Sequence, residues 1–295
     1  MKRDKLFAQA SAALNALGIN EELCVCPLCC TAYGKDALEA RILTLEHVPP
    51  KSVNGREIVL TCRNCNNYAG SKYDHYLKLR EDFESARRAI LPGAGDGAGR
   101  FVLEAAGIKV NAHLVSEGNK KLFTMSPRHN HWKVMSAFQE HISKFGPGDQ
   151  FNVTFSQRYS NRKARIADMK SAFLAVTAKF GFSFALNDEL KSVRAQLLDV
   201  ERNHFEPVTV ACREMPRNKI LLDERQGLVF IRFDRHVHVL PWVNHGSDNF
   251  EGHRARQFRS TASGKLFELP KSFEAGLDHS GMLKDYLRFT PPIDQ

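Results

Sequence analysis

The stretch of sequence that decides the fold is LTLEHVPPKSVNGREIVLTCRNCNN, residues 43–67. It contains a Glu-His pair after an apolar segment, then a polar turn, a second apolar run and a Cys-x-x-Cys followed by two asparagines. A second Cys-x-x-Cys lies upstream, at residues 26–29. Two such pairs supply four thiolates, the ligand set that tetrahedral structural zinc prefers. The spacing therefore predicts a structural zinc site formed by Cys26, Cys29, Cys62 and Cys65.

Cysteine usage also bears on the compartment. Six of the seven cysteines fall between residues 24 and 65, and Cys24 and Cys30 are alternative ligands beside the first pair. The first 20 residues lack the unbroken apolar stretch of a secretory signal, and the chain has no apolar run long enough to span a membrane. In such a chain clustered cysteines indicate metal binding before disulfides. We expect a cytoplasmic protein that does not enter a membrane.

Between the two cysteine pairs the sequence resembles the HNH endonuclease family, in particular its zinc-braced, treble-clef members. The resemblance covers about residues 22–78 and rests on several short motifs. These motifs are the cysteine pairs, Leu-Glu-His-Val-Pro-Pro at 45–50, Asn54-Gly55, Asn66-Asn67, Gly70-Ser71 and Asp74. The resemblance implies a ββα-metal fold and metal-dependent hydrolysis of phosphodiester bonds in DNA.

The resemblance also implies a role for individual residues. His47 matches the general base, and Glu46 and Asn66 match the residues that hold a catalytic Mg²⁺ or Mn²⁺ ion. The middle position of the motif is usually asparagine but falls here on Glu57. Glu57 would brace the loop in its own way, unless nearby Asn54 takes that role.

These residue types suit the chemistry. Hydrolysis of a phosphodiester needs an activated water and neutralisation of the charge that develops on the leaving oxygen. A neutral imidazole can accept the proton of the water, and a hard cation with oxygen ligands can stabilise the leaving group. Sulfur ligands favour zinc and oxygen ligands favour Mg²⁺ or Mn²⁺, so two metals with different roles are expected.

The charge of the chain favours a polyanionic partner. The sequence has 42 Lys and Arg against 33 Asp and Glu, a formal net charge of +9 and a pI near 9.2. Five basic residues are candidates for phosphate contacts, with ordinary solvated surface charge as the alternative. They are Lys51, Arg56, Lys72, Arg162 and Arg165. DNA is the expected partner, RNA is not excluded, and a protein partner or an oligomer stays open.

At 295 residues the chain suits two unequal domains. We expect an N-terminal helix within residues 1–20 that packs on a nuclease domain at 21–92. The glycine-rich segment 93–100 reads as a flexible linker. Residues 101–295 alternate strand-like and helical patterns, so they predict a mixed α+β domain that positions substrate or regulates activity. The expected class is α+β throughout.

Together these patterns predict an HNH-type endonuclease, and stand-alone proteins of this type often act in phage defence or mobile elements. The main alternative is a non-catalytic zinc module that binds nucleic acid or a protein partner. An RNA-directed nuclease is the third reading.

Overall fold

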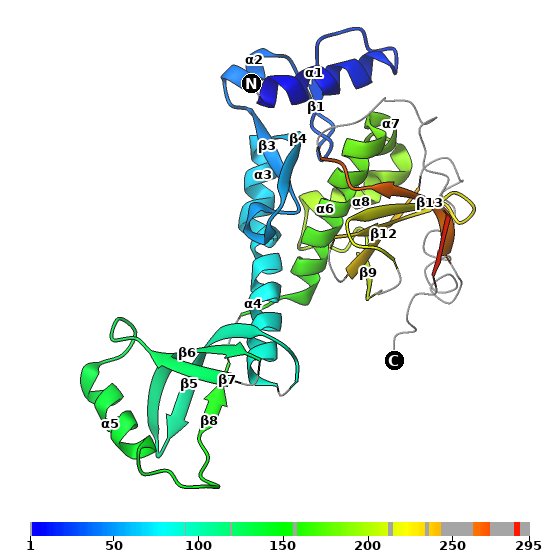
Figure 1. Cartoon of the computed structure of the whole chain (residues 1–295). Helices are drawn as coiled ribbons and strands as arrows, with labels where there is room; N and C mark the ends of the chain where they lie inside the picture. The colour runs from blue at the N-terminus through cyan, green and yellow to red at the C-terminus, as the bar shows by residue number, and fades with distance from the viewer. Residues whose placement is uncertain are drawn as a thin grey trace. The chain divides into compact units, whose positions relative to one another are not determined.

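The computed structural model describes residues 2–91, 93–118, 120–155, 158–211, 215–233, 236–242, 262–271 and 286–289. It is a mixed α+β protein, as the sequence predicts. The chain divides into two units (Figure 1): unit 1 is Met1–Leu77 with Asn161–Gln295, and unit 2 is Lys78–Ser160. Unit 2 is therefore an insertion in the sequence of unit 1, and the two are described separately.

This division differs from the predicted domains, because the glycine-rich segment 93–100 does not separate them. Residues from Gly97 onward belong to strand β5 (Gly97–Ala105) of unit 2. A side chain at Gly97 would collide with the carbonyl oxygen of Ser85, and one at Gly99 would lie 2.7 Å from the Cβ of Ala86. These glycines permit close packing of a strand on a helix rather than chain flexibility.

Unit 1 begins with helix α1 (Lys2–Asn15), whose buried side chains include Leu6, Phe7 and Leu14. The helix packs against β1 (Cys24–Val25) and β4 (Arg56–Cys62). β1 pairs antiparallel with β2 (Ala32–Tyr33), and the short helix α2 (Asp36–Glu39) follows. The β1–β2 hairpin carries the first Cys-x-x-Cys at its turn.

The decisive stretch forms an antiparallel hairpin and then a helix. Strand β3 (Leu43–Val48) pairs with β4, and a 3₁₀ turn η1 (Lys51–Val53) lies between them. Asn54 ends that turn at φ 64°, and a side chain at Gly55 would overlap the carbonyl oxygen of Pro49. The register shifts between Glu46 and His47, which introduces a β-bulge.

The helix after β4 has three consecutive segments. It runs as α3 (Arg63–Ala69), a π-helical turn η2 (Gly70–Asp74) and α4 (His75–Ile90), and the division between the units falls within α4. The π-helical turn buries Tyr73 and Asp74. Because π-turns occur frequently at functional sites, this departure from regular helix geometry directs attention to Asp74.

The rest of unit 1 is built around α6 (Asn161–Phe180), which is buried on nearly all sides. It contacts β3, β4 and η2, and Figure 1 shows it beside the hairpin. The short helix α7 (Phe182–Ala185), the turn η3 (Asp188–Leu190) and helix α8 (Lys191–Leu198) follow. Tyr73 Oη donates a hydrogen bond to the carbonyl oxygen of Leu197 at 3.0 Å, which joins η2 to α8.

A six-stranded antiparallel sheet completes unit 1, with strand order β14-β13-β10-β11-β12-β9. Its strands are β9 (Val208–Ala211), β10 (Lys219–Asp223), β11 (Leu228–Arg232), β12 (His236–Pro241), β13 (Ala262–Glu268) and β14 (Tyr286–Phe289). Every residue of β11 is buried, and α6 packs on β12 and β9. Contacts with both the hairpin and the sheet account for the burial of α6 on nearly all sides.

Unit 2 is a four-stranded antiparallel sheet of order β7-β6-β5-β8 with helix α5 (Trp132–Ile142). Its other strands are β6 (Ile108–Glu117), β7 (Lys120–Met125) and β8 (Asn152–Thr154). Side chains alternate between buried and more exposed along β5 and β6, as the predicted pattern requires. Its core contains Phe101, Leu103, Val110, Leu114 and Phe138.

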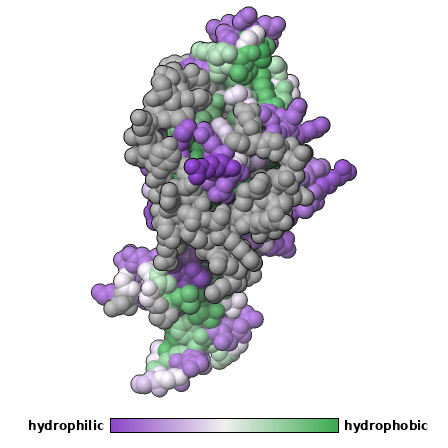
Figure 2. Space-filling view, turned by 90° about the vertical axis from the view of Figure 1, so that its right-hand side faces the viewer, coloured by the Kyte–Doolittle hydropathy of each residue, from purple (hydrophilic) through white to green (hydrophobic). Residues whose placement is uncertain are grey.

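The surface mixes polar and apolar side chains. Figure 2 shows hydrophobic surface at the height of α1 and α2 in Figure 1, and again over unit 2. The exposed apolar residues of these regions include Leu17, Ile42, Leu122 and Trp132. Among the residues that the structure describes, no helix combines the length and the apolar character needed to cross a membrane.

Candidate functional site

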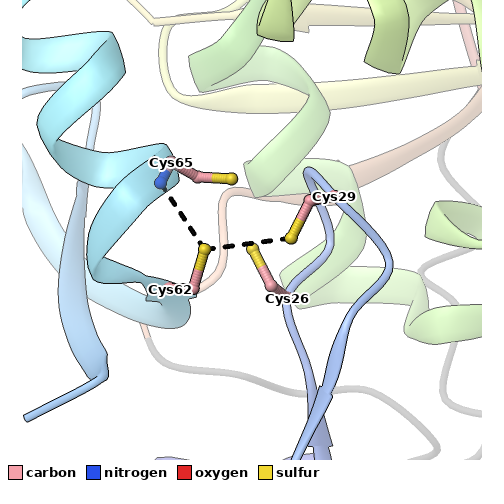
Figure 3. A group of neighbouring side chains, drawn as sticks. All are labelled: Cys26, Cys29, Cys62 and Cys65. Atoms are coloured by element: carbon pink, nitrogen blue, oxygen red, sulfur yellow. Dashed lines mark hydrogen bonds between the residues drawn. The ribbon is translucent and has the colours of Figure 1, made fainter.

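The four predicted zinc ligands lie together in unit 1. The Sγ atoms of Cys26, Cys29, Cys62 and Cys65 all lie within 4.8 Å of one another, and Figure 3 shows them arriving from the β1–β2 hairpin and the start of α3. The Cys29 and Cys62 sulfurs are 3.8 Å apart. A tetrahedral zinc with Zn–S bonds of 2.3 Å would separate its sulfurs by about 3.8 Å, so the arrangement fits this ion.

Local geometry explains the choice among the cysteines. Cys62 accepts the backbone N–H of Cys65 and caps α3, while the N–H of Cys30 donates to the carbonyl oxygen of Cys26 and closes the first turn. Cys30 is exposed, and burial raises the pKa of the Cys24 thiol to about 12. The four sulfurs that lie together belong to Cys26, Cys29, Cys62 and Cys65, so Cys24 and Cys30 are outside the cluster.

Glu46, the predicted metal ligand, lies in a buried ion-pair cluster. Its Oε1 is 2.9 Å from Nζ of Lys170, and its Oε2 accepts a hydrogen bond of 3.1 Å from the hydroxyl of Thr61. The same Nζ lies 2.5 Å from Oδ2 of Asp74. Three elements, β3, η2 and α6, therefore meet at one ammonium group.

The cluster is shielded from water. The side chains of Glu46, Asp74 and Lys170 are 4%, 11% and 0% exposed. Burial disfavours the charged ammonium, but Glu46 and Asp74 outweigh this effect, so the pKa of Lys170 is raised. Burial also raises the pKa of Asp74, against the lowering effect of Lys170. Within the described residues, Oδ1 of Asp74 is buried and has no hydrogen-bond partner.

His47, the predicted general base, follows the register shift between β3 and β4 and is only partly buried. It is directly opposite Glu57 in the β3–β4 register, and its Nε2 lies 3.6 Å from Oε1 of Glu57. The His47 and Glu57 side chains are 27% and 28% exposed. Glu57 also accepts a hydrogen bond of 2.8 Å from Lys2, which is the main cause that lowers its pKa. An accessible imidazole beside a carboxylate can exchange a proton with a ligand.

Asn66 and Asn54 have different surroundings from those predicted. The side-chain amide of Asn66 donates to Oγ1 of Thr44 at 3.0 Å and to the carbonyl oxygen of Leu45 at 3.4 Å. Asn66 thereby fastens α3 to β3. Asn54 is exposed and ends the turn η1.

The five basic candidates separate into two groups. Lys51, Arg56 and Lys72 are exposed in or just after the hairpin. Arg162 donates to the carbonyl oxygens of Val200 and Arg202, and Arg165 donates to that of Pro207. The latter two guanidinium groups therefore bind the backbone of their own chain.

Two residues of the buried cluster were missing from the predicted site. Asp74 was part of the resemblance but had no assigned role, and Lys170 was not among the predicted site residues. One signal was present: Lys170 is four residues after Ile166 and three before Phe173, so it interrupts the apolar stripe of its helix. A lysine in a buried stripe needs an acidic partner, but the sequence does not say which one.

Comparisons of the chain with protein-family models, with curated proteins and with solved structures found no match. The site is therefore defined by its own geometry: a four-cysteine cluster that could hold a zinc ion, a buried Glu46–Lys170–Asp74 cluster and a partly exposed His47–Glu57 pair.

Proposed function

We propose that this chain is a zinc-braced nuclease that hydrolyses phosphodiester bonds in DNA with His47 as the general base. The observation that carries the proposal is the pairing of His47 with Glu57, at 3.6 Å, on a partly exposed edge of the hairpin. The hairpin is joined through Cys62 to the four-sulfur centre, which would hold it in one conformation.

The two side chains have complementary roles in this proposal. The imidazole of His47 accepts a proton from the attacking water. The carboxylate of Glu57 orients the ring and stabilises the imidazolium that forms, as carboxylates do beside other catalytic histidines. Lys2 keeps Glu57 in place through its hydrogen bond of 2.8 Å. Glu57 is thus a positioning residue at the place where the resemblance leads to asparagine.

The substrate would meet the hairpin from its exposed side. Lys51 and Arg56 are exposed and lie in or near the 3₁₀ turn η1 that joins the two strands. Their positive charges support a polyanionic substrate, because a phosphodiester must have its charge neutralised during attack.

The Mg²⁺ or Mn²⁺ ion that the resemblance implies does not fit the residues assigned to it. Both carboxylate oxygens of Glu46 are engaged, one by Lys170 and one by Thr61. The amide nitrogen of Asn66 donates to β3, so its Oδ1 alone would remain as a metal ligand beside the engaged Glu46. We therefore derive no catalytic step through a metal at these two residues.

A cleavage assay tests the proposal. Supercoiled plasmid is incubated with the protein in Mg²⁺, in Mn²⁺ and in buffer freed of divalent ions over a chelating resin, with zinc content measured afterwards. His47→Ala should lower the cleavage rate by about 10²–10⁴-fold, the usual contribution of a general base. His129→Ala, which removes an exposed histidine of unit 2, is the matched control and should cleave like wild type. Equal cleavage by wild type and His47→Ala would contradict the proposal.

The burial of Glu46 favours a second candidate, a zinc module that binds nucleic acid without cleaving it. In a gel-shift assay this candidate predicts DNA binding that His47→Ala leaves unchanged, with intact plasmid in every buffer. A parallel assay on single-stranded RNA separates the remaining alternative, because cleavage of RNA alone would replace DNA as the substrate.

A further inference from the structure

We propose that the ammonium group of Lys170 is the resident cation of this site and takes the place beside Glu46 that the resemblance gives to a divalent metal. The inference deepens the proposed function and rests on it for its catalytic consequence. Its binding test is independent of cleavage.

The contacts of Lys170 match those of a bound cation. Its Nζ lies 2.9 Å from Oε1 of Glu46 and 2.5 Å from Oδ2 of Asp74, so one positive charge bridges two carboxyl groups from different elements. The remaining oxygen of Glu46 accepts the Thr61 hydroxyl. Glu46 therefore offers no oxygen that is free of a partner.

The burial of the cluster works against exchange of this cation for a metal. Mg²⁺ gives up its water shell reluctantly and requires near-octahedral oxygen ligands. Here the Lys170 side chain is 0% exposed and that of Glu46 is 4% exposed. A metal at Glu46 would also lie next to the ammonium, and two positive charges repel strongly in a poorly hydrated interior.

The arrangement gives Lys170 a positioning role through Glu46. His47 is the next residue along β3, where the register shift occurs. Because Lys170 and Thr61 hold the Glu46 carboxylate from both sides, they fix the strand at the residue before the general base. Cleavage by His47 should then proceed without a divalent ion at Glu46, and exposed cations such as Lys51 and Arg56 would neutralise the phosphate.

Manganese binding to the full-length, zinc-loaded protein tests the inference, with Mn²⁺ itself as the probe and electron paramagnetic resonance as the readout. Wild type should show no Glu46-dependent site with a dissociation constant below about 1 mM, the weak end of biological divalent-ion sites. If wild type does bind Mn²⁺ in this range, Glu46→Gln and Asp74→Asn are measured in the same way. Loss of the Mn²⁺ site in a variant that retains its zinc would overturn the inference.

A gain-of-binding variant provides a second test. Lys170→Ala removes the ammonium and leaves two facing carboxyl groups, so it should acquire one Mn²⁺ site that the double variant Lys170→Ala, Glu46→Gln lacks. A Lys170→Ala protein that keeps its zinc and its circular dichroism spectrum but gains no Mn²⁺ would overturn the inference. If this variant does not fold, the wild-type measurement decides.

The two proposals fail in different ways. Intact plasmid in all three buffers, together with no Glu46-dependent Mn²⁺ site, contradicts the nuclease and leaves the cation assignment standing. Cleavage that depends on His47 and on added Mg²⁺, together with a Glu46-dependent Mn²⁺ site, contradicts the cation assignment alone.

Discussion

The Nζ atom of Lys170 lies 2.9 Å from Oε1 of Glu46, although 124 positions separate these residues in the sequence. The same ammonium contacts Asp74 in the π-helical turn that follows the cysteine cluster. The β3–β4 hairpin and the buried helix α6 are therefore parts of one unit. Glu46, which the sequence assigns to catalysis, has a tertiary role in this arrangement.

Loss of the Lys170 charge should destabilise unit 1. We expect Lys170→Met to lower the free energy of unfolding by about 3–5 kcal/mol, because it leaves two buried carboxyl groups without their cation. Urea unfolding followed by circular dichroism measures the change. Lys163→Met is the control on the same helix, since Lys163 pairs with the exposed Glu201 at 3.4 Å, and it should cost about 1 kcal/mol or less. Equal losses of unfolding free energy in the two variants would show that the buried cluster contributes no more to stability than an exposed ion pair.

Stability should depend on pH through Asp74. Burial is the largest cause that raises its pKa above the ordinary 3.8, Glu46 raises it further, and Lys170 and His75 lower it. A raised pKa means that the folded chain binds this proton more tightly than the unfolded chain does. The stabilising contribution of Asp74 is therefore greatest below pH 3.8 and is lost as the pH rises through the raised pKa.

Asp74→Asn cannot titrate at this position, so it should gain stability relative to wild type as the pH rises from about 4 to about 7. The measurement is the difference between the two urea midpoints at each pH. Effects of pH on zinc binding occur in both proteins and largely cancel in that difference. A difference that stays constant over this range would rule out a raised pKa at Asp74.

The four-sulfur centre should bind about one zinc per chain, and Cys65→Ser should reduce zinc content to near zero and unfold the hairpin region, because metal affinity and folding are coupled. Cys30→Ser is the matched control, since Cys30 is exposed and its sulfur lies outside the cluster. Elemental analysis of the purified proteins measures the zinc content of both variants. Zinc retained by Cys65→Ser would mean that another residue completes the site.

Removal of the Glu57 charge should slow the proposed reaction without abolishing it. We expect Glu57→Gln to lower kcat by about 10–100-fold with a smaller change in KM, as for other residues that orient a functional histidine. Lys2→Ala removes one hydrogen bond to Glu57 but leaves its carboxylate opposite His47, so it should have a weaker effect. Cleavage rates under saturating plasmid distinguish them. A Glu57→Gln protein as active as wild type would leave Glu57 with no part in catalysis.

The clustering of the four cysteines could be predicted because the information is local. A Cys-x-x-Cys turn presents two sulfurs on one side whatever the rest of the chain does. The sequence has two such turns, so each is the natural partner of the other. The hairpin and the helix after Cys62 followed from the same stretch. The α+β class followed from alternating strand-like and helical patterns.

The rest of the site depends on contacts between distant parts of the sequence. No local pattern specifies that Lys170 pairs with Glu46 and Asp74, or that Asn66 joins the helix to β3. The domain boundary was misplaced for a related reason. Glycines at 97 and 99 suggest flexibility, whereas they permit a close approach to Ser85 and Ala86.

The insertion of unit 2 also has a consequence for biosynthesis. Asp74 and its cation Lys170 are 96 positions apart, with the whole of unit 2 between them. At ordinary translation rates this distance corresponds to about 5–20 s. During that interval the nascent chain presents the carboxyl groups of Glu46 and Asp74 with no lysine yet made to neutralise them. Zinc capture at the cysteines can precede the burial of these acids, which must wait until α6 emerges from the ribosome.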